Sequence, residues 1–155
     1  MGKKIFVNIP VKDLNKSIAF YCAMGFTQNF NFSDETAACM IISEENYVML
    51  LTHEKFKGFS AAPIPDAHKA PGFAVAIECA NRADVDAQVL AGLAAGGSEP
   101  TPPLELSFMY QRTIADPDGH RARWHLPHRL GEKPARDHGP SLLHDLHLGR
   151  GPDRH

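Results

Sequence analysis

The sequence predicts an α+β fold in which one order of elements, strand, helix, strand, strand, strand, occurs twice along the chain. Two observations carry this prediction. Residues 5–26 have the pattern of a strand, a capped helix and a terminating glycine, and residues 73–97 repeat that pattern. After each helix, short segments with strand-like alternation follow, separated by turn residues. With 155 residues, of which 43% are hydrophobic, the chain has room for one globular domain around a single core.

The first strand is predicted where Val7, Ile9 and Val11 alternate with the residues between them, which gives the strand one apolar face. Asp13 is placed to cap the helix that follows, and Gly25 is placed to end it. The apolar stripe of this helix is predicted from residues at helical spacing, namely Leu14, Ile18, Tyr21 and Cys22. Three more strands are then predicted, over residues 26–32, 36–43 and 47–52.

The middle of the chain, residues 55–70, has two prolines and no sustained period, and is predicted to be a linker or lid anchored by Phe56 and Phe59. A strand over residues 73–79 begins the second half. Asn81 caps its helix, which ends at Gly96-Gly97. The stripe of this second helix is predicted to consist of Val85, Val89, Leu90 and Leu93.

The second half closes with a short strand near residues 98–100, a proline-rich loop and a strong strand over residues 108–115. The dipeptide Asp118-Gly119 signals a tight turn, so a last strand is expected over about residues 121–126. Each half therefore supplies four strands and one helix.

Charge and composition exclude some classes of partner. Residues 1–120 hold nine Lys and Arg against 14 Asp and Glu, and this acidic body argues against a nucleic-acid partner. No apolar run approaches the ~20 residues of a membrane span, so we expect no membrane partner and a cytoplasmic location. Three cysteines, Cys22, Cys39 and Cys79, lie in apolar surroundings and are predicted to be buried reduced thiols.

The end of the chain differs in composition. Seven of the nine histidines lie at or after His120, and residues 127–155 are an irregular segment rich in His, Arg, Pro and Gly. One hypothesis is that the chain beyond His120 is read in a shifted frame. The alternative is metal capture by histidines at helical spacing, such as His144 and His147.

Three segments together resemble the vicinal oxygen chelate superfamily, which includes glyoxalase, bleomycin-resistance proteins and extradiol dioxygenases. They are VKDLNKSIAFYCAMGF (residues 11–26), VDAQVLAGLAAGG (residues 85–97) and DPDGH (residues 116–120). The resemblance covers about residues 3–120. It implies two βαβββ modules, residues 3–54 and 71–126, that form one domain over residues 1–126. Their sheets would curl around a shared cleft, which a second chain often completes in a homodimer.

Metal-using members of that superfamily place one His or Glu ligand on each of four strands. Matched one by one, these positions carry Phe6, Leu50, Ala74 (or its neighbour Phe73) and Arg123. Apolar side chains offer no donor atoms, and a guanidinium is permanently charged. No cofactor is therefore predicted, and a divalent metal would require that the usual positions be bypassed.

A cleft without metal is predicted to bind a small molecule, of anionic or aromatic kind. On the strand before DPDG, either Tyr110 and Arg112 or Met109, Gln111 and Thr113 point inward, and the first pair is preferred. Arg112 could hold a carboxylate or phosphate, or form only a surface salt bridge. The resemblance places Phe6, Leu50, Ala74 and Arg123 at the cleft, and counting by twos from them adds neighbours on the same face of each strand. The predicted binding set is Phe6, Asn8, Val48, Leu50, Thr52, Ala74, Tyr110, Arg112 and Arg123. The alternative is that Phe6, Val48 and Leu50 only fill the core.

Three functions stay open at this point. The first is a metal-free small-molecule-binding protein of the glyoxalase and bleomycin-resistance type. The second is a lyase, isomerase or dioxygenase of the same superfamily, with a displaced metal site. The third is an inactive degenerate paralogue.

Overall fold

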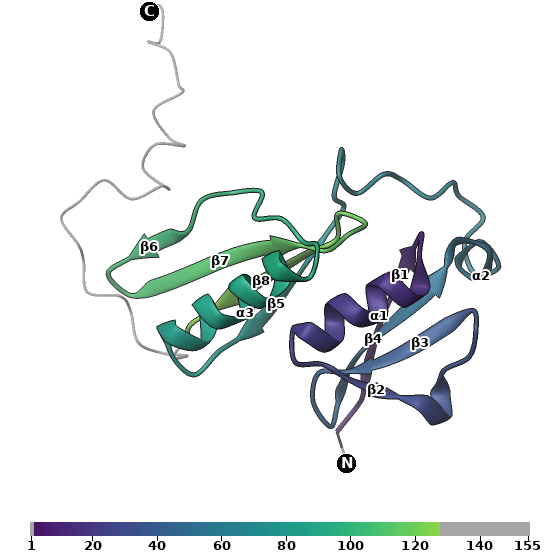
Figure 1. The fold of residues 1–155 in the computed structure, drawn as a ribbon, viewed down its shortest axis with the longest axis horizontal. Helices are drawn as coiled ribbons and strands as arrows, with labels where there is room; N and C mark the ends of the chain where they lie inside the picture. Colours follow the sequence, from purple (N-terminus) through teal and green to yellow (C-terminus); the bar gives the residue numbers. More distant parts are fainter. Residues whose placement is uncertain (1, 128–155) are drawn as a thin grey trace, which may run out of the picture.

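A computed structural model describes residues 2–127, and it has the predicted order of elements twice (Figure 1). The first module contains β1 (Ile5–Val11), α1 (Leu14–Ala23), β2 (Thr27–Asn29), β3 (Ala37–Ile41) and β4 (Asn46–Thr52). The second module contains β5 (Ala74–Glu78), α3 (Arg82–Ala94), β6 (Leu104–Leu106), β7 (Met109–Ala115) and β8 (Arg121–His125). Two short elements were not predicted: the 3₁₀ helix η1 (Phe30–Phe32) and the helix α2 (His53–Lys57). The predicted α+β class with two βαβββ modules is confirmed.

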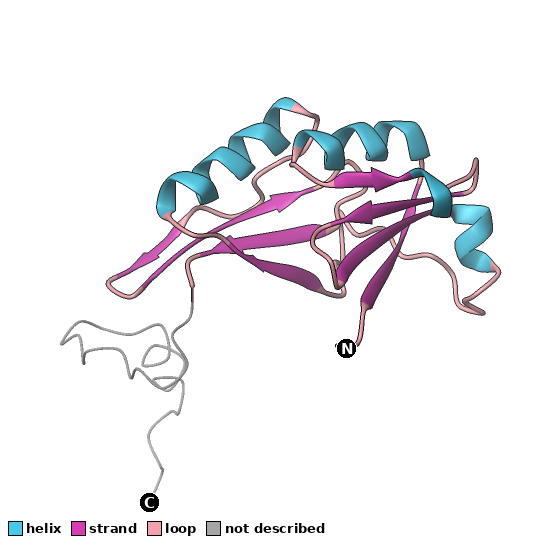
Figure 2. Ribbon diagram, turned by 90° about the horizontal axis from the view of Figure 1, so that it is seen from below, coloured by secondary structure: helices cyan, strands magenta, loops and turns pink. Residues whose placement is uncertain are grey.

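The eight strands form two separate four-stranded sheets, in the orders β1-β4-β3-β2 and β5-β8-β7-β6. In each sheet the first strand of the module pairs in parallel with the last, and the other pairs are antiparallel. Both α1 and α3 lie on the same side of the strands (Figure 2). We call the other side the open face. Pro10, which has no N–H to donate, lies in β1 at the edge of its sheet, where a proline is tolerated.

A single core lies beneath the helices and joins the two modules. Ile9, Val48 and Leu50 enter it from the first sheet, and Ile114 and Trp124 enter it from the second. The two modules therefore stabilise each other through shared apolar burial.

The helix ends are where the sequence places them. The Asp13 carboxylate accepts a bond from the Lys16 N–H at 3.1 Å, and the Asn81 side chain accepts one from the Asp84 N–H at 2.9 Å. Gly25 and Gly96 follow the helices with φ of 91° and 99°, a conformation that side chains with a Cβ rarely adopt.

The predicted strand over residues 26–32 is only partly correct, because it stops at Asn29. The Asn29 side chain accepts a bond from the Asn31 N–H at 3.1 Å, and the Ser33 hydroxyl donates to the Asn29 carbonyl at 2.7 Å. These local bonds compete with sheet pairing and turn the chain into η1.

The helix stripes also differ from the prediction. In α1, Tyr21 is buried as predicted, and Leu14 and Ile18 pack against the core. Cys22 is exposed rather than buried, because Ser17 and Phe20 lie on the core side of the helix. Cys39 and Cys79 are buried free thiols as expected, and burial raises the pKa of both.

In α3, Val85 and Val89 are buried as predicted, whereas Leu90 and Leu93 are exposed. Their place is taken by Gly92, where a Cβ atom would lie 2.7 Å from the Met24 sulfur. The missing side chain brings α3 close to the elements beneath it.

The connection between the modules differs from the predicted linker in two ways. Residues 53–57 form α2, and Phe59, predicted as an anchor, is 74% exposed. Near residues 98–100 the expected strand is reduced to one bridge between Ser98 and Ala115, and β6 lies inside the predicted proline-rich loop.

The predictions for residues 128–155, including the reading-frame hypothesis and the His144 and His147 pair, lie outside the described residues. Within residues 2–127 no helix combines the length and apolar character needed to cross a membrane.

The turn after β7 fastens the two modules together, and we call its bonds the module clasp. The Asp116 carboxylate, 2% exposed, accepts bonds from the Tyr21 hydroxyl at 2.6 Å and from the Asp118 and His120 N–H groups at 2.9 Å. The Asp118 carboxylate accepts bonds from the Lys12 N–H at 2.8 Å and the Ser17 hydroxyl at 3.3 Å. The DPDG segment thus has a structural role that reaches across the chain.

Burial is the main cause of the pKa shifts of Tyr21 and Asp116 in the module clasp. It raises the pKa of the Tyr21 hydroxyl well above its ordinary value, and the negative charge of Asp116 raises that pKa further. Burial also raises the pKa of Asp116 itself, although the bond from Tyr21 opposes this shift.

We expect Tyr21→Phe to lower the free energy of unfolding by about 1 to 3 kcal/mol near neutral pH, since a buried carboxylate loses a donor. Because folding raises the pKa of this hydroxyl, its contribution is complete below about pH 10, the value in unfolded chains, and is lost as the pH rises above it. Above about pH 10 the unchanged protein should therefore lose stability more steeply than the variant, by up to about 1.4 kcal/mol per pH unit.

Urea denaturation at about pH 8 and about pH 11 measures this difference in slope. The matched control is Tyr47→Phe, which removes a hydroxyl bonded at 2.6 Å to the exposed Glu44 carbonyl. An equal effect of Tyr21→Phe at both pH values would show that the Tyr21 hydroxyl ionises as readily in the folded chain as in the unfolded chain.

Candidate ligand-binding site

A pocket of about 430 Å³ lies on the open face of the first module. Strands β1, β3 and β4 supply its floor, and β2 with η1 supplies one wall. This volume falls in the range of small-molecule sites. The lining residues are Lys4, Phe6, Asn8, Asn29, Phe32, Cys39, Tyr47 and Met49.

The register of the parallel pair β1 and β4 determines which side chains share this face. Phe6 lies beside Tyr47, and Asn8 lies beside Met49. The rings of Phe6 and Tyr47 stack with centroids 4.6 Å apart and planes 9° apart. The Lys4 ammonium lies 5.8 Å from the centroid of the Tyr47 ring. The pocket therefore has an aromatic floor with a cation at its edge.

Few polar groups complete the lining. The Asn8 amide nitrogen donates to the Phe6 carbonyl at 3.3 Å, which leaves the Asn8 side-chain oxygen without a partner among residues 2–127. The Asn29 side-chain oxygen is used by η1, so its amide nitrogen is available. An acceptor, a donor and an ammonium group can thus orient a ligand on the apolar floor.

The structure does not bring Val48 and Leu50 to this pocket. In β4 they pair with Val7 and Ile9 and point to the opposite side, into the core beneath α1, where Leu50 is 0% exposed. The shared face with Phe6 belongs to Tyr47 and Met49. Thr52 lies at the end of β4, and its hydroxyl accepts a bond from the Lys55 N–H at 3.2 Å, which caps α2.

Tyr110 and Arg112 also point to the helix side, so the preferred choice for β7 is wrong. The Arg112 guanidinium donates twice to Glu99, at 2.7 and 2.9 Å, and once to Asp86 of α3 at 3.0 Å. The Tyr110 hydroxyl donates to the same Asp86 and holds the pKa of that carboxyl below its usual value. Arg112 thus forms the salt-bridge network that was its alternative.

Ala74 and Arg123 do lie on the open face, but in the second sheet. Ala74 is at the start of β5, and Arg123, in β8, donates to the Gln111 side chain at 2.9 Å. The structure therefore brings Phe6 and Asn8 together and separates them from most of the predicted set.

The four positions of the superfamily's metal ligands do not fit a divalent cation. Phe6, Leu50 and Ala74 have no donor atom, Arg123 is cationic, and Leu50 faces the core. Within the described part of the chain, no three His, Cys, Asp or Glu side chains gather where they could hold a metal ion.

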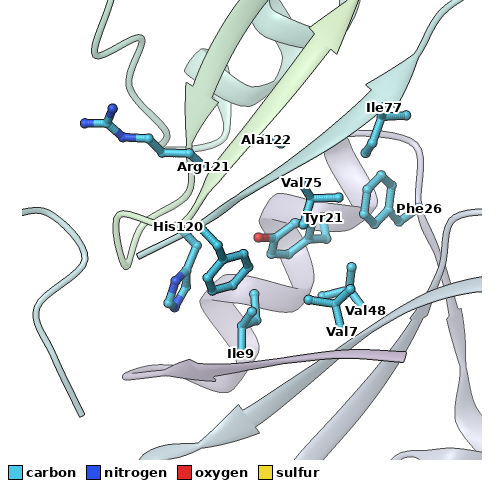
Figure 3. Close-up of a pocket in the computed structure, with 11 residues that line it drawn as sticks. Val7, Ile9, Tyr21, Phe26, Val48, Val75, Ile77, His120, Arg121 and Ala122 are labelled. Atoms are coloured by element: carbon cyan, nitrogen blue, oxygen red, sulfur yellow. The ribbon is translucent and has the colours of Figure 1, made fainter. Parts of the chain in front are cut away.

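A second, much smaller space lies at the seam between the modules (Figure 3). Val7 and Ile9 border it from β1, and Val75 and Ile77 border it from β5. Its volume of about 20 Å³ is enough for about one water molecule and too small for a ligand. It belongs to the core.

The sequence did not predict Tyr47 and Met49 as site residues, since it does not show which alternate residues of β4 lie on the same face as Phe6 of β1. The stacked ring pair could have been found by considering both faces of β4, because one of them places Tyr47 beside Phe6. Lys4, Asn29, Phe32 and Cys39 gave no signal of their own, because β2, β3 and η1 bring them to the pocket.

Comparison with known protein families gives one match. The model of the Glyoxalase/Bleomycin resistance protein/Dioxygenase superfamily matches residues 5–123. None of the curated proteins matches the chain.

Several solved structures share the fold. A hypothetical protein from S. aureus is 24% identical, with a TM-score of 0.70, and the match covers 82% of this chain and 95% of that chain. A glyoxalase/bleomycin resistance protein/dioxygenase family enzyme from Burkholderia phytofirmans is 20% identical, with a TM-score of 0.65 and coverage of 81% and 98%. A glyoxalase-related enzyme from Fulvimarina pelagi is 16% identical, with a TM-score of 0.69 and coverage of 82% and 89%. At such identities the likeness concerns the fold alone.

Proposed function

The chain belongs to the Glyoxalase/Bleomycin resistance protein/Dioxygenase superfamily, and from this premise we propose that it binds a small aromatic molecule in the pocket on the open face of its first module. The observation that carries the proposal is the stacked pair of Phe6 and Tyr47 on the floor of that pocket. Each ring covers one face of the other, so a flat aromatic ligand can stack on an outer ring face or meet the ring edges.

The polar groups narrow the ligand class. The Lys4 ammonium stands beside the ring floor, so an aromatic carboxylate gains a charge partner that a neutral aromatic compound lacks. Asn8 and Asn29 offer one acceptor and one donor for groups on the ring. Binding is proposed to need no divalent cation, since the four usual ligand positions carry side chains that cannot hold one.

A thermal-shift screen of small aromatic carboxylates against neutral aromatic compounds tests the proposal, because a ligand of the folded state raises apparent stability. We expect Phe6→Ala to weaken binding at least about fivefold, since half of the ring floor is lost. The matched control is Phe59→Ala, which removes an exposed phenylalanine outside the pocket and should leave affinity unchanged.

Two results would contradict the proposal. If no aromatic compound raises the midpoint temperature of thermal unfolding, the inactive paralogue becomes the better interpretation. If metal analysis after reconstitution finds one tightly held transition metal per chain, the metal-free part fails and the enzyme alternative gains support. The homodimer, the cytoplasmic location and the absence of a nucleic-acid partner stay predictions.

A further inference from the structure

A larger pocket, of about 720 Å³, lies at the other end of β1 and is separate from the aromatic pocket. We call it the basic pocket. Lys12, which precedes α1, and Lys16, in the first turn of α1, line one side of it. His53 and Lys57 line it from α2. Loop residues 63–68 and the turn residues Pro117, Asp118 and His120 line the rest of it. No residue lines both pockets, so the inference below does not depend on the proposed function.

The ammonium groups that line this pocket are unpaired as far as the described residues go. Among residues 2–127, the ammonium groups of Lys12, Lys16 and Lys57 form no hydrogen bond or ion pair. The two carboxylates in the lining already accept bonds. Asp118 accepts from the Lys12 N–H and the Ser17 hydroxyl, and Asp66 accepts from the His68 N–H at 3.0 Å.

Two of the lining histidines are also engaged. The His68 ring donates to the Pro117 carbonyl at 2.9 Å, and the His120 ring donates to the Pro10 carbonyl at 2.7 Å. The lining therefore holds three ammonium groups against two carboxylates, and its charge is net positive. This arrangement contrasts with the acidic balance of residues 1–120.

The walls are held in place before any ligand arrives. The module clasp fixes the 117–120 turn against α1, and the His68 bond fixes the loop against that turn. A Cβ on Gly119 would lie 2.4 Å from the His68 nitrogen, so turn and loop are in close contact. A site whose walls are already ordered loses less conformational entropy on binding.

The geometry points to a phosphate-bearing small molecule as the ligand of the basic pocket, and we propose that it is such a site. Three ammonium groups, of Lys12, Lys16 and Lys57, line this one pocket. A phosphate ester carries about −1.5 to −2 charges near pH 7, so it can neutralise more of them than a singly charged carboxylate can. The volume admits a phosphorylated metabolite and exceeds what inorganic phosphate needs.

Isothermal titration of the full chain with pyrophosphate, at constant ionic strength set by NaCl, tests the proposal. The variant Lys16→Ala/Lys57→Ala should bind pyrophosphate at least about tenfold more weakly than the unchanged protein. The matched control is Lys3→Ala/Lys55→Ala, which removes the same charge from residues outside the lining, one of them on α2 as well. The control should retain the affinity of the unchanged protein.

The proposal is overturned if pyrophosphate gives no more heat than NaCl, or if both double variants lose affinity equally. Titration with glycerol 3-phosphate and with inorganic phosphate then shows whether the pocket prefers an organic phosphate ester or the free phosphate ion. Tighter binding of the ester identifies an organic phosphate, and tighter binding of the inorganic ion identifies free phosphate. Thermal unfolding of both variants shows whether they are folded in the titration.

Discussion

Gly119→Ala is expected to lower the free energy of unfolding by about 3 kcal/mol or more, measured by urea denaturation. Gly119 has a φ of 91°, which costs about 1 to 2 kcal/mol for a residue with a Cβ. The added Cβ would also lie 2.4 Å from the His68 nitrogen and 2.7 Å from the Ala67 carbonyl carbon. Both are main-chain atoms, so a whole segment would have to move.

Gly72→Ala is the matched control. A Cβ there meets no atom within 4 Å, and the φ of Gly72 lies outside the left-handed region. We expect a change within about 0.5 kcal/mol. Similar stability of the two variants would mean that the 67–68 segment does not pack on the turn in solution, and the basic pocket would then lose its outer wall.

Leu50→Ala is expected to lower the free energy of unfolding by about 2 to 5 kcal/mol, because Leu50 is fully buried and its loss leaves a cavity. Ligand affinity of the folded variant should not change, since Leu50 faces away from the aromatic pocket. Denaturation and a titration with the aromatic carboxylate found in the screen measure both quantities.

The neighbouring residue provides the control. Met49 is half-buried on the open face and lines the aromatic pocket, so Met49→Ala should cost about 1 kcal/mol of stability and weaken binding. The reverse pattern, a binding loss for Leu50→Ala and none for Met49→Ala, would show that β4 presents its other face to the ligand.

The fold was predictable because each module has strong local signals. Asp13 and Asn81 cap the helices, Gly25 and Gly96 end them, and Asp118-Gly119 marks the last turn. These signals act over a few residues and need no knowledge of the tertiary structure. The short elements were missed for the opposite reason. For example, β6 is a strand because β7 pairs with it, although its own three residues directly follow two prolines.

The site was less predictable, because it depends on which side of each strand faces the helices. In β4, Val48 and Leu50 alternate with Tyr47, Met49 and Leu51, and both sets are largely apolar. In β7, the polar Arg112 lies on the helix side because Glu99 and Asp86 neutralise it there. Sequence alternation alone cannot choose between two such faces, whereas pairing with β1 and contact with α3 do.

The module clasp also has a consequence for synthesis. Its bonds from Tyr21, Ser17 and Lys12 close spans of 95, 101 and 106 residues. The first module therefore emerges from the ribosome well before the carboxylates that its hydroxyls and main chain will bond. Until residue 118 leaves the exit tunnel, the Ser17 hydroxyl and the Lys12 N–H of the growing chain lack the carboxylate that they bond in the folded protein.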